Sequence, residues 1–254
     1  MEICIIGGFP RAGTRQFTDI LNNHDNASIK GEFYPKVISS LLNVFQIADK
    51  INAGRWTGDN YRKWRMMSAL NAYAAFSKGS NSPFDFQGLK VAGFKCPRAE
   101  NNFLEIKEVI GFERVVFFYC VRNVKESFLS ENSSFGVSVE DYVSKTTESM
   151  RSGLAVSENE NVDFQVLSLD EFLCAHDKTS WVIDNMLSKF RELSFDEHDV
   201  RNILGKVENT NATERHGKKR RTRMTREECE FFNESSEFLR LAKLFEDKYK
   251  IKVL

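Results

Sequence analysis

Residues 2–15 read Glu-Ile-Cys-Ile-Ile-Gly-Gly-Phe-Pro-Arg-Ala-Gly-Thr-Arg, and this stretch decides the fold. Its first half, residues 2–7, is a short apolar run that is typical of a buried strand in a parallel sheet. A glycine-containing loop follows, and then a helical pattern places Phe17, Ile20 and Leu21 on one face. A strand, a loop and a helix in this order predict an α/β fold.

The same alternation continues along the chain. Further strands are predicted over residues 28–33, 89–95, 114–121 and 164–169, with helices between and after them. A last helix is predicted to begin at the capping box of Thr225 and Glu228 and to run to about Tyr249. This order favours a mostly parallel central sheet flanked by helices. No linker divides the chain, so residues 1–254 are expected to form a single domain, in which residues 50–88 are a helical insertion.

Composition excludes several classes of protein. The chain has 254 residues with 36 Lys or Arg and 36 Asp or Glu, so its formal net charge is zero. This balance argues against a globally basic nucleic-acid binder, although a local basic patch stays possible. No apolar run reaches the roughly 18 residues of a membrane-spanning helix, and the N-terminus shows no signal-peptide pattern. The five cysteines are scattered without a Cys-x-x-Cys pair, so neither a metal site nor a disulfide framework is expected. The composition favours a cytoplasmic enzyme or binding protein.

The loop after the first strand has the composition of an anion site. Three glycines in residues 7–13 let the backbone approach a ligand closely, and the start of a helix attracts anions through its N–H groups and dipole. Arg11, Thr14 and Arg15 add two guanidinium groups and a hydroxyl. The Walker A pattern is absent, because Gly13 is followed by Thr14 and Arg15 instead of Lys and Ser or Thr. The alternative interpretation is an ordinary strand–turn–helix connection.

A second polar site follows the most apolar strand, residues 114–121. Ligands of open α/β sheets bind beyond the carboxyl ends of the strands, where Arg122 stands. Ser130 comes eight residues later, about two turns into the next predicted helix, and the pair can converge on one phosphate. Taken alone, the pair is more simply interpreted as a surface arginine and a solvated serine.

Together, these two segments resemble the sulfotransferase family, whose members transfer a sulfuryl group from 3′-phosphoadenosine 5′-phosphosulfate (PAPS). Family members open with a strand and a Pro-Lys-x-Gly-Thr loop, which residues 10–15 match with Arg11 at the lysine position. The Gly-Thr-Arg ending is most similar to the heparan sulfate 3-O-sulfotransferase branch. The family's 3′-phosphate motif has an arginine with a serine eight residues on, as in Arg122 and Ser130. The resemblance implies that the 3′-phosphate is held by these two residues and the 5′-phosphosulfate by Arg11, Ala12, Gly13, Thr14 and Arg15.

Three shorter matches add to the resemblance. Lys95 begins a Lys-x-Pro pattern at the position where the family lysine faces the sulfate. Glu32 stands where the glycosaminoglycan branch places a catalytic glutamate, and as a general base on the acceptor hydroxyl it would need partial burial. The basic run 215–223 precedes the last predicted helix, where family members carry a loop that closes over the 3′-phosphate and adenosine. The loop residues implied by this match are Arg215, Gly217 and Lys218.

The resemblance implies a fold of the P-loop nucleotide-binding type and a PAPS-dependent sulfotransferase. The expected acceptor is a hydroxyl of a carbohydrate or small molecule, with residues 50–88 shaping its pocket, and the expected product is adenosine 3′,5′-bisphosphate. Catalysis would involve Glu32, Arg11 and Lys95 without a metal ion. Arg11 departs from the family lysine, since an arginine has a different shape and does not give up a proton. The alternatives are a nucleotide-dependent kinase or other phosphoryl transferase, and a non-catalytic nucleotide-binding relative. The basic run has a further alternative in an anionic polysaccharide or nucleic acid, although nucleic acid is not the expected partner.

Overall fold

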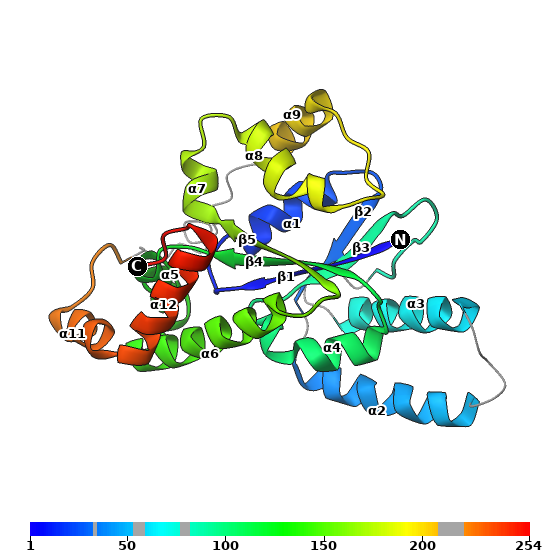
Figure 1. The fold of residues 1–254 in the computed structure, drawn as a ribbon, viewed down its shortest axis with the longest axis horizontal. Coiled ribbons are helices and arrows are strands. Elements are labelled where there is room, and N and C mark those ends of the chain that lie inside the picture. The colour runs from blue at the N-terminus through cyan, green and yellow to red at the C-terminus, as the bar shows by residue number, and fades with distance from the viewer. Residues whose placement is uncertain (33–34, 53–58, 77–81, 208–220) are drawn as a thin grey trace.

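A computed structural model describes residues 1–32, 35–52, 59–76, 82–207 and 221–254. Its centre is a sheet of five strands, all parallel, in the order β2-β3-β1-β4-β5 (Figure 1). The α/β class with a parallel sheet is therefore as predicted. The strands are β1 (Glu2–Gly8), β2 (Ala27–Lys30), β3 (Val91–Lys95), β4 (Val115–Val121) and β5 (Val162–Ser168).

Helices connect these strands and follow the last of them. Between β1 and β3 lie α1 (Thr14–Asn22), α2 (Pro35–Asn52) and α3 (Asp59–Phe76). Between β3 and β5 lie the short 3-10 helix η1 (Ala99–Asn102), α4 (Phe103–Ile110), α5 (Val124–Phe135) and α6 (Val139–Ser157). After β5 come α7 (Leu169–Cys174), α8 (Lys178–Asn185), the 3-10 helix η2 (Leu187–Lys189), α9 (Glu197–Lys206), α11 (Arg226–Glu234) and α12 (Ser236–Tyr249). None of the helices in these ranges combines the length and the apolarity needed to cross a lipid bilayer.

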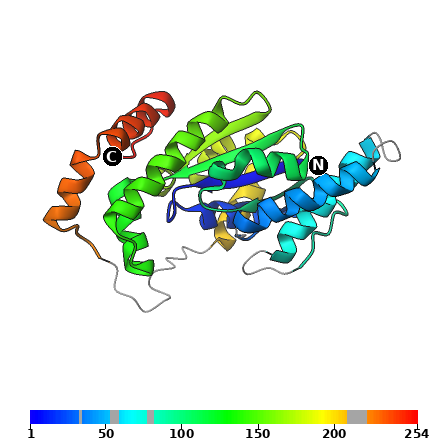
Figure 2. The ribbon, with the colours of Figure 1, turned by 90° about the horizontal axis from the view of Figure 1, so that it is seen from below.

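The helices form a layer on each face of the sheet. In Figure 1, α1 and α7 to α9 lie above the sheet, while α2, α3, α4 and α6 lie below it. Figure 2 shows the lower layer in front of the strands. Phe17 of α1 stacks on Trp181 of α8 at 5.7 Å between ring centroids, and Tyr119 of β4 stacks on Phe245 of α12 at 5.2 Å. β4 is buried along its whole length, because it is covered from both faces.

The chain connections bring the carboxyl ends of β1 and β4 side by side. β1 leads through α1 toward β2 on one side of the sheet, whereas β4 leads through α5 and α6 to β5 on the other side. Neighbouring strands whose connections leave in opposite directions open a crevice at their carboxyl ends, where ligands of such sheets bind. Gly8 lies opposite Cys120 in the register, and the Phe9 N–H donates to the Cys120 carbonyl at 2.9 Å.

Two predicted elements differ from the structure. The prediction of a single last helix is wrong. The structure has two helices there, since α11 ends at Glu234 and α12 begins at Ser236. At the break, the Ser235 hydroxyl donates to the Phe231 carbonyl at 2.7 Å, and the turn lets both helices pack on α6. The strand predicted over 28–33 is β2 (Ala27–Lys30), whose pairing with β3 ends at Lys30, and the last predicted residue, Phe33, lies outside the described residues.

Candidate functional site

The loop between β1 and α1 has a conformation that depends on glycine. Gly8, Arg11 and Gly13 have φ angles of 98°, 62° and 84°, all in the left-handed region. A Cβ at Gly8 would lie 2.2 Å from the Cys120 carbonyl oxygen, so only glycine fits between the two strand ends. Gly13 is the N-cap residue of α1 and has no side chain that could cap the helix start. The first N–H groups of α1 are therefore available to an anion in the loop.

The structure brings the two predicted phosphate segments together. The Arg11 Nε donates to the Ser130 Oγ at 3.0 Å. One turn earlier on α5, the Ser127 hydroxyl donates to the Pro10 carbonyl at 2.6 Å. Both serines are buried, so Ser130 is not the solvated serine of the simpler interpretation. Two side chains of α5 thus hold the loop against the end of β4.

Arg122 lies just past the end of β4 with 15% of its side chain exposed. Its Nη2 lies 3.5 Å from Glu126 and its Nε 3.5 Å from Asp170, and both carboxylates are more exposed than the arginine. Among the described residues, the buried Nε has no hydrogen-bond partner. A guanidinium has five N–H donors, so these two long ion pairs leave Arg122 capacity for an oxyanion at the sheet edge.

The remaining residues of the predicted 5′ loop differ in what they can contribute. Ala12 is fully buried, so it can offer a ligand only its backbone. Thr14 is buried at the first position of α1. Arg15 is exposed and pairs with Asp19 one turn along α1 at 3.6 Å. Arg11 is therefore the side chain of this loop that the structure joins directly to the second segment.

Glu32 and Lys95 lie together, as their predicted joint role requires. The Lys95 Nζ is 2.8 Å from the Glu32 Oε1, with 15% of the lysine and 40% of the glutamate side chain exposed. Lys95 is the last residue of β3, and Glu32 follows the end of the neighbouring strand β2. This ion pair therefore stands on the same sheet edge as the loop after β1, at the ends of the next two strands.

Sequence reasoning missed a buried glutamate beneath the loop. Glu100 of η1 is 3% exposed, and its Oε2 accepts the Gly8 N–H at 2.9 Å. The Ser149 hydroxyl of α6 donates to its other oxygen, and the Tyr119 hydroxyl lies 2.8 Å from the same Ser149 Oγ. Burial raises the pKa of Glu100 to about 7, against the opposing effects of these hydrogen bonds and of the Arg98 charge. The only sequence signal was an acidic residue five positions after Lys95, beyond the end of a strand.

Arg98, which directly precedes η1, also holds the loop after β1 and forms an ion pair with Glu131. The Arg98 N–H donates to the Gly8 carbonyl at 3.0 Å, and its guanidinium lies 3.4 Å from the Glu131 Oε1. Glu131 follows Ser130 on α5 and is buried, which raises the pKa of its carboxyl. Gly8 is therefore held through its N–H by Glu100 and through its carbonyl by Arg98.

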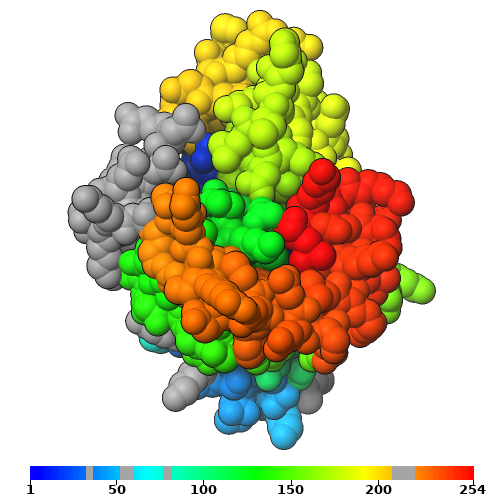
Figure 3. Space-filling view, turned by 90° about the vertical axis from the view of Figure 1, so that its left-hand side faces the viewer, coloured from blue at the N-terminus to red at the C-terminus, as the bar shows by residue number. Residues whose placement is uncertain are grey.

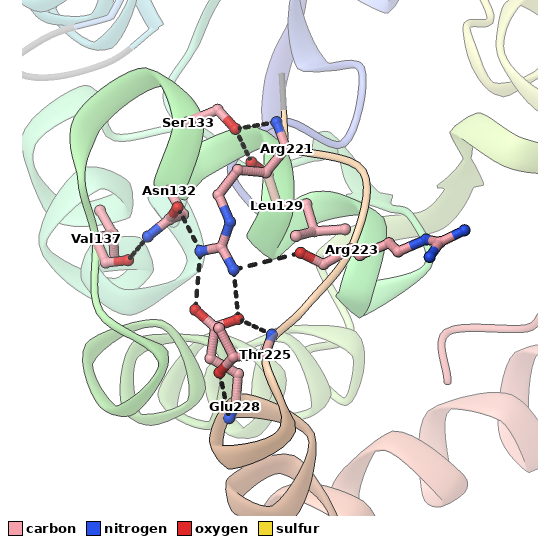
Figure 4. Close-up of polar contacts among 8 residues, drawn as sticks. All are labelled: Leu129, Asn132, Ser133, Val137, Arg221, Arg223, Thr225 and Glu228. Atoms are coloured by element: carbon pink, nitrogen blue, oxygen red, sulfur yellow. Dashed lines mark hydrogen bonds and ion pairs between the residues drawn. The ribbon is translucent and has the colours of Figure 1, made fainter. Parts of the chain in front are cut away.

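The basic segment is described only from Arg221 onward. The residues predicted to close over the nucleotide lie outside the described residues: Arg215, Gly217 and Lys218. Figure 4 shows that the Arg221 guanidinium donates to both carboxylate oxygens of Glu228, at 2.9 and 2.7 Å, and to the Asn132 Oδ1 at 2.9 Å. Its backbone N–H donates to the Ser133 Oγ at 2.9 Å. The basic segment is thus anchored at its C-terminal end on α5, one turn beyond Ser130.

The surface at the carboxyl ends of the strands is shown in Figure 3. A small blue area of the N-terminal region is visible there between the green surface of α5 and the yellow-green surface that follows β5. Within the ranges that the structure describes, no three His, Cys, Asp or Glu side chains gather into a possible metal site. No protein-family model matches the chain, and no curated protein matches its sequence.

Proposed function

We propose that this protein is a PAPS-dependent sulfotransferase that transfers a sulfuryl group to a hydroxyl of a carbohydrate or small-molecule acceptor. The observation that carries the proposal is the 3.0 Å hydrogen bond between the Arg11 Nε and the Ser130 Oγ. PAPS carries a 5′-phosphosulfate and a 3′-phosphate on one nucleoside, so it needs two anion sites within a nucleotide's reach. The contact supports this requirement, because it brings the loop after β1 and the helix after β4 next to each other.

Both ends of the donor find suitable groups. The N–H groups at the start of α1 and the Arg11 guanidinium would hold the 5′-phosphosulfate, since anions bind where unpaired N–H groups and a cation converge. Arg122 and Ser130 would hold the 3′-phosphate. Arg122 is partly exposed at the sheet edge and both of its ion pairs are long, at 3.5 Å, which supports an additional anionic partner at this point.

The acceptor side of the reaction would lie at Glu32 and Lys95. The Glu32 carboxylate takes the proton of the acceptor hydroxyl while the acceptor oxygen attacks sulfur. The bond from sulfur to the 5′-phosphate oxygen breaks, and its electron pair stays on that oxygen, where Arg11 stabilises the growing charge. The 2.8 Å ion pair supports these roles, because it holds Glu32 in place, and Lys95 would then stabilise the sulfuryl oxygens. The products are a sulfate ester and adenosine 3′,5′-bisphosphate.

Ligand binding tests the donor assignment. Thermal unfolding with adenosine 3′,5′-bisphosphate should show a clear rise in Tm, because saturation to 100 times Kd adds about 2.7 kcal/mol to the free energy of unfolding. Adenosine 5′-phosphate should give a smaller rise. No shift at millimolar bisphosphate, with folded protein, would reject the proposal. A response to Mg-ATP without any response to the bisphosphate would favour a phosphoryl transferase instead.

Variants test the chemistry separately from binding. With radiolabelled PAPS and a panel of hydroxyl acceptors, Glu32→Gln should lose sulfate transfer and keep bisphosphate binding. Lys95→Met should also lose transfer, since both partners of the ion pair are needed. If the wild-type protein transfers no sulfate and the Arg11→Lys variant does, the protein is a non-catalytic relative that has kept the binding site.

A further inference from the structure

Glu100 occupies a position that the proposed reaction does not use. It belongs to η1, the turn that follows β3, and lies on the buried side of the loop after β1. Its carboxylate contacts the loop backbone at Gly8 directly. A Cβ at Gly7 would lie 2.6 Å from the Glu100 Oε2, so the chain leaves room for this carboxylate by having glycine there.

The hydrogen bonds around Glu100 can be assigned for both of its protonation states. When it is ionised, Gly8 and Ser149 donate to its two oxygens, and the Tyr119 hydroxyl donates to Ser149. When it is protonated, it donates to Ser149, Ser149 donates to Tyr119, and the Gly8 N–H keeps its acceptor. The loop contact therefore survives protonation, and what changes is the charge beneath the loop.

The groups that face Glu100 do not change charge near neutral pH. Arg98, from the same turn, is a permanent cation that already pairs with Glu131. Tyr119 and Cys120 of β4 are fully buried, which raises the pKa of each well above its usual value and keeps both neutral. Two further tyrosines face Tyr119 from α6 and α12: Tyr142 and Tyr249.

We propose that Glu100 is a positioning residue that holds the nucleotide loop through Gly8 and takes up a proton when the nucleotide binds. The inference rests on the proposed function. A polyanion in the loop adds negative charge above a buried carboxylate, where low polarity strengthens repulsion. The neutral acid removes the repulsion and keeps the Gly8 hydrogen bond, so proton uptake follows binding.

The size of the effect follows from linkage. Burial already places the pKa of Glu100 at about 7 without ligand. If binding makes this acid tenfold weaker, about half a proton is taken up at pH 7.5. The same change makes binding about sixfold tighter at pH 6.5 than at pH 8.5, beyond the ligand's own titration.

Titration calorimetry of adenosine 3′,5′-bisphosphate in two buffers of different ionisation enthalpy measures this proton uptake. The wild-type protein should take up about half a proton more than Glu100→Gln at pH 7.5, while the isosteric variant still binds. The phosphate groups of the ligand titrate near pH 6 in both proteins and cancel in the difference. Glu131→Gln is the matched control, because Glu131 is a second buried carboxyl near the loop that does not contact Gly8.

Each outcome decides the inference. Uptake lost in Glu131→Gln and kept in Glu100→Gln would overturn it, and so would equal uptake in all three proteins. If Glu100→Gln does not fold, Ser149→Ala serves instead. This variant loses a hydrogen-bond donor to the Glu100 carboxylate, so the pH midpoint of its bisphosphate binding should lie above that of the wild-type protein. An unmoved midpoint would also overturn the inference. Failure of every protein to bind the bisphosphate at any pH would reject the proposed function, and the inference with it.

Discussion

Arg122→Met should separate the two phosphate sites of the proposed nucleotide. The arginine side chain is 15% exposed and keeps guanidinium donors beyond its two 3.5 Å ion pairs, so a 3′-phosphate would gain a charge-assisted contact there. Hydrogen bonds to charged groups contribute about 1.5–3 kcal/mol. Adenosine 3′,5′-bisphosphate should therefore bind roughly 10- to 150-fold more weakly to the variant. Adenosine 5′-phosphate, which lacks the 3′ group, should change by less than about twofold.

The stability of the variant decides whether the binding change is local. Both partners of Arg122, Glu126 and Asp170, are more than a third exposed, so the free energy of unfolding should fall by about 1 kcal/mol or less. Arg151→Met is the matched control, since it removes the same charge from the exposed ion pair between Arg151 of α6 and Glu237 of α12. Calorimetric titration of the two ligands against both variants gives the comparison. Equal losses for both ligands, or no loss for the bisphosphate, would refute the assignment of Arg122.

Other perturbations test the loop and its anchors. Gly8→Ala should lower the free energy of unfolding by roughly 3 kcal/mol or more in urea titrations, because its Cβ would meet Cys120. Gly136→Ala, which also has a positive φ but open space around the new Cβ, should cost about 1 kcal/mol. Since the folded protein binds a proton at Glu100 more tightly than the unfolded chain does, stability should fall by about 3 kcal/mol as the pH rises from about 4.5 to about 7, and Glu100→Gln should lack this loss. Arg221→Gln should lower the free energy of unfolding by about 1 kcal/mol, and an unchanged urea midpoint would contradict its anchoring role.

Local patterns were sufficient to predict most of the fold. The apolar run 114–121 predicted β4, because a strand buried on both faces has apolar residues throughout. The helical spacing of apolar residues after Gly13 predicted α1, because an amphipathic helix repeats them every three to four residues. The strand order was beyond such patterns. The position of β1 between β3 and β4 is set by tertiary packing. It puts the loop after β1 next to the helix after β4, so that Arg11 contacts Ser130.

The break in the predicted last helix has a similar cause. Residues 226–249 have no proline or glycine, and the local signal for a break is limited to the polar residues Asn233, Ser235 and Ser236. Phe232 instead packs against Phe128 of α5 and Phe238 of α12. Packing of Phe232 against two other helices favours a turn at Ser235. This preference comes from tertiary contacts, which override the local helix propensity.

Glu100 shows why part of the site was not predictable. The turn after Lys95 is polar, and an acidic residue in such a turn is usually solvated. Gly7 was interpreted as a place where an anion approaches the loop, but a side chain there would collide with Glu100 as well. A glycine is needed wherever the backbone is approached closely, whether by a ligand or by another side chain. At Gly7 the approach comes from the interior of the protein, so the glycines that predict a phosphate loop also make room for the buried acid that supports it.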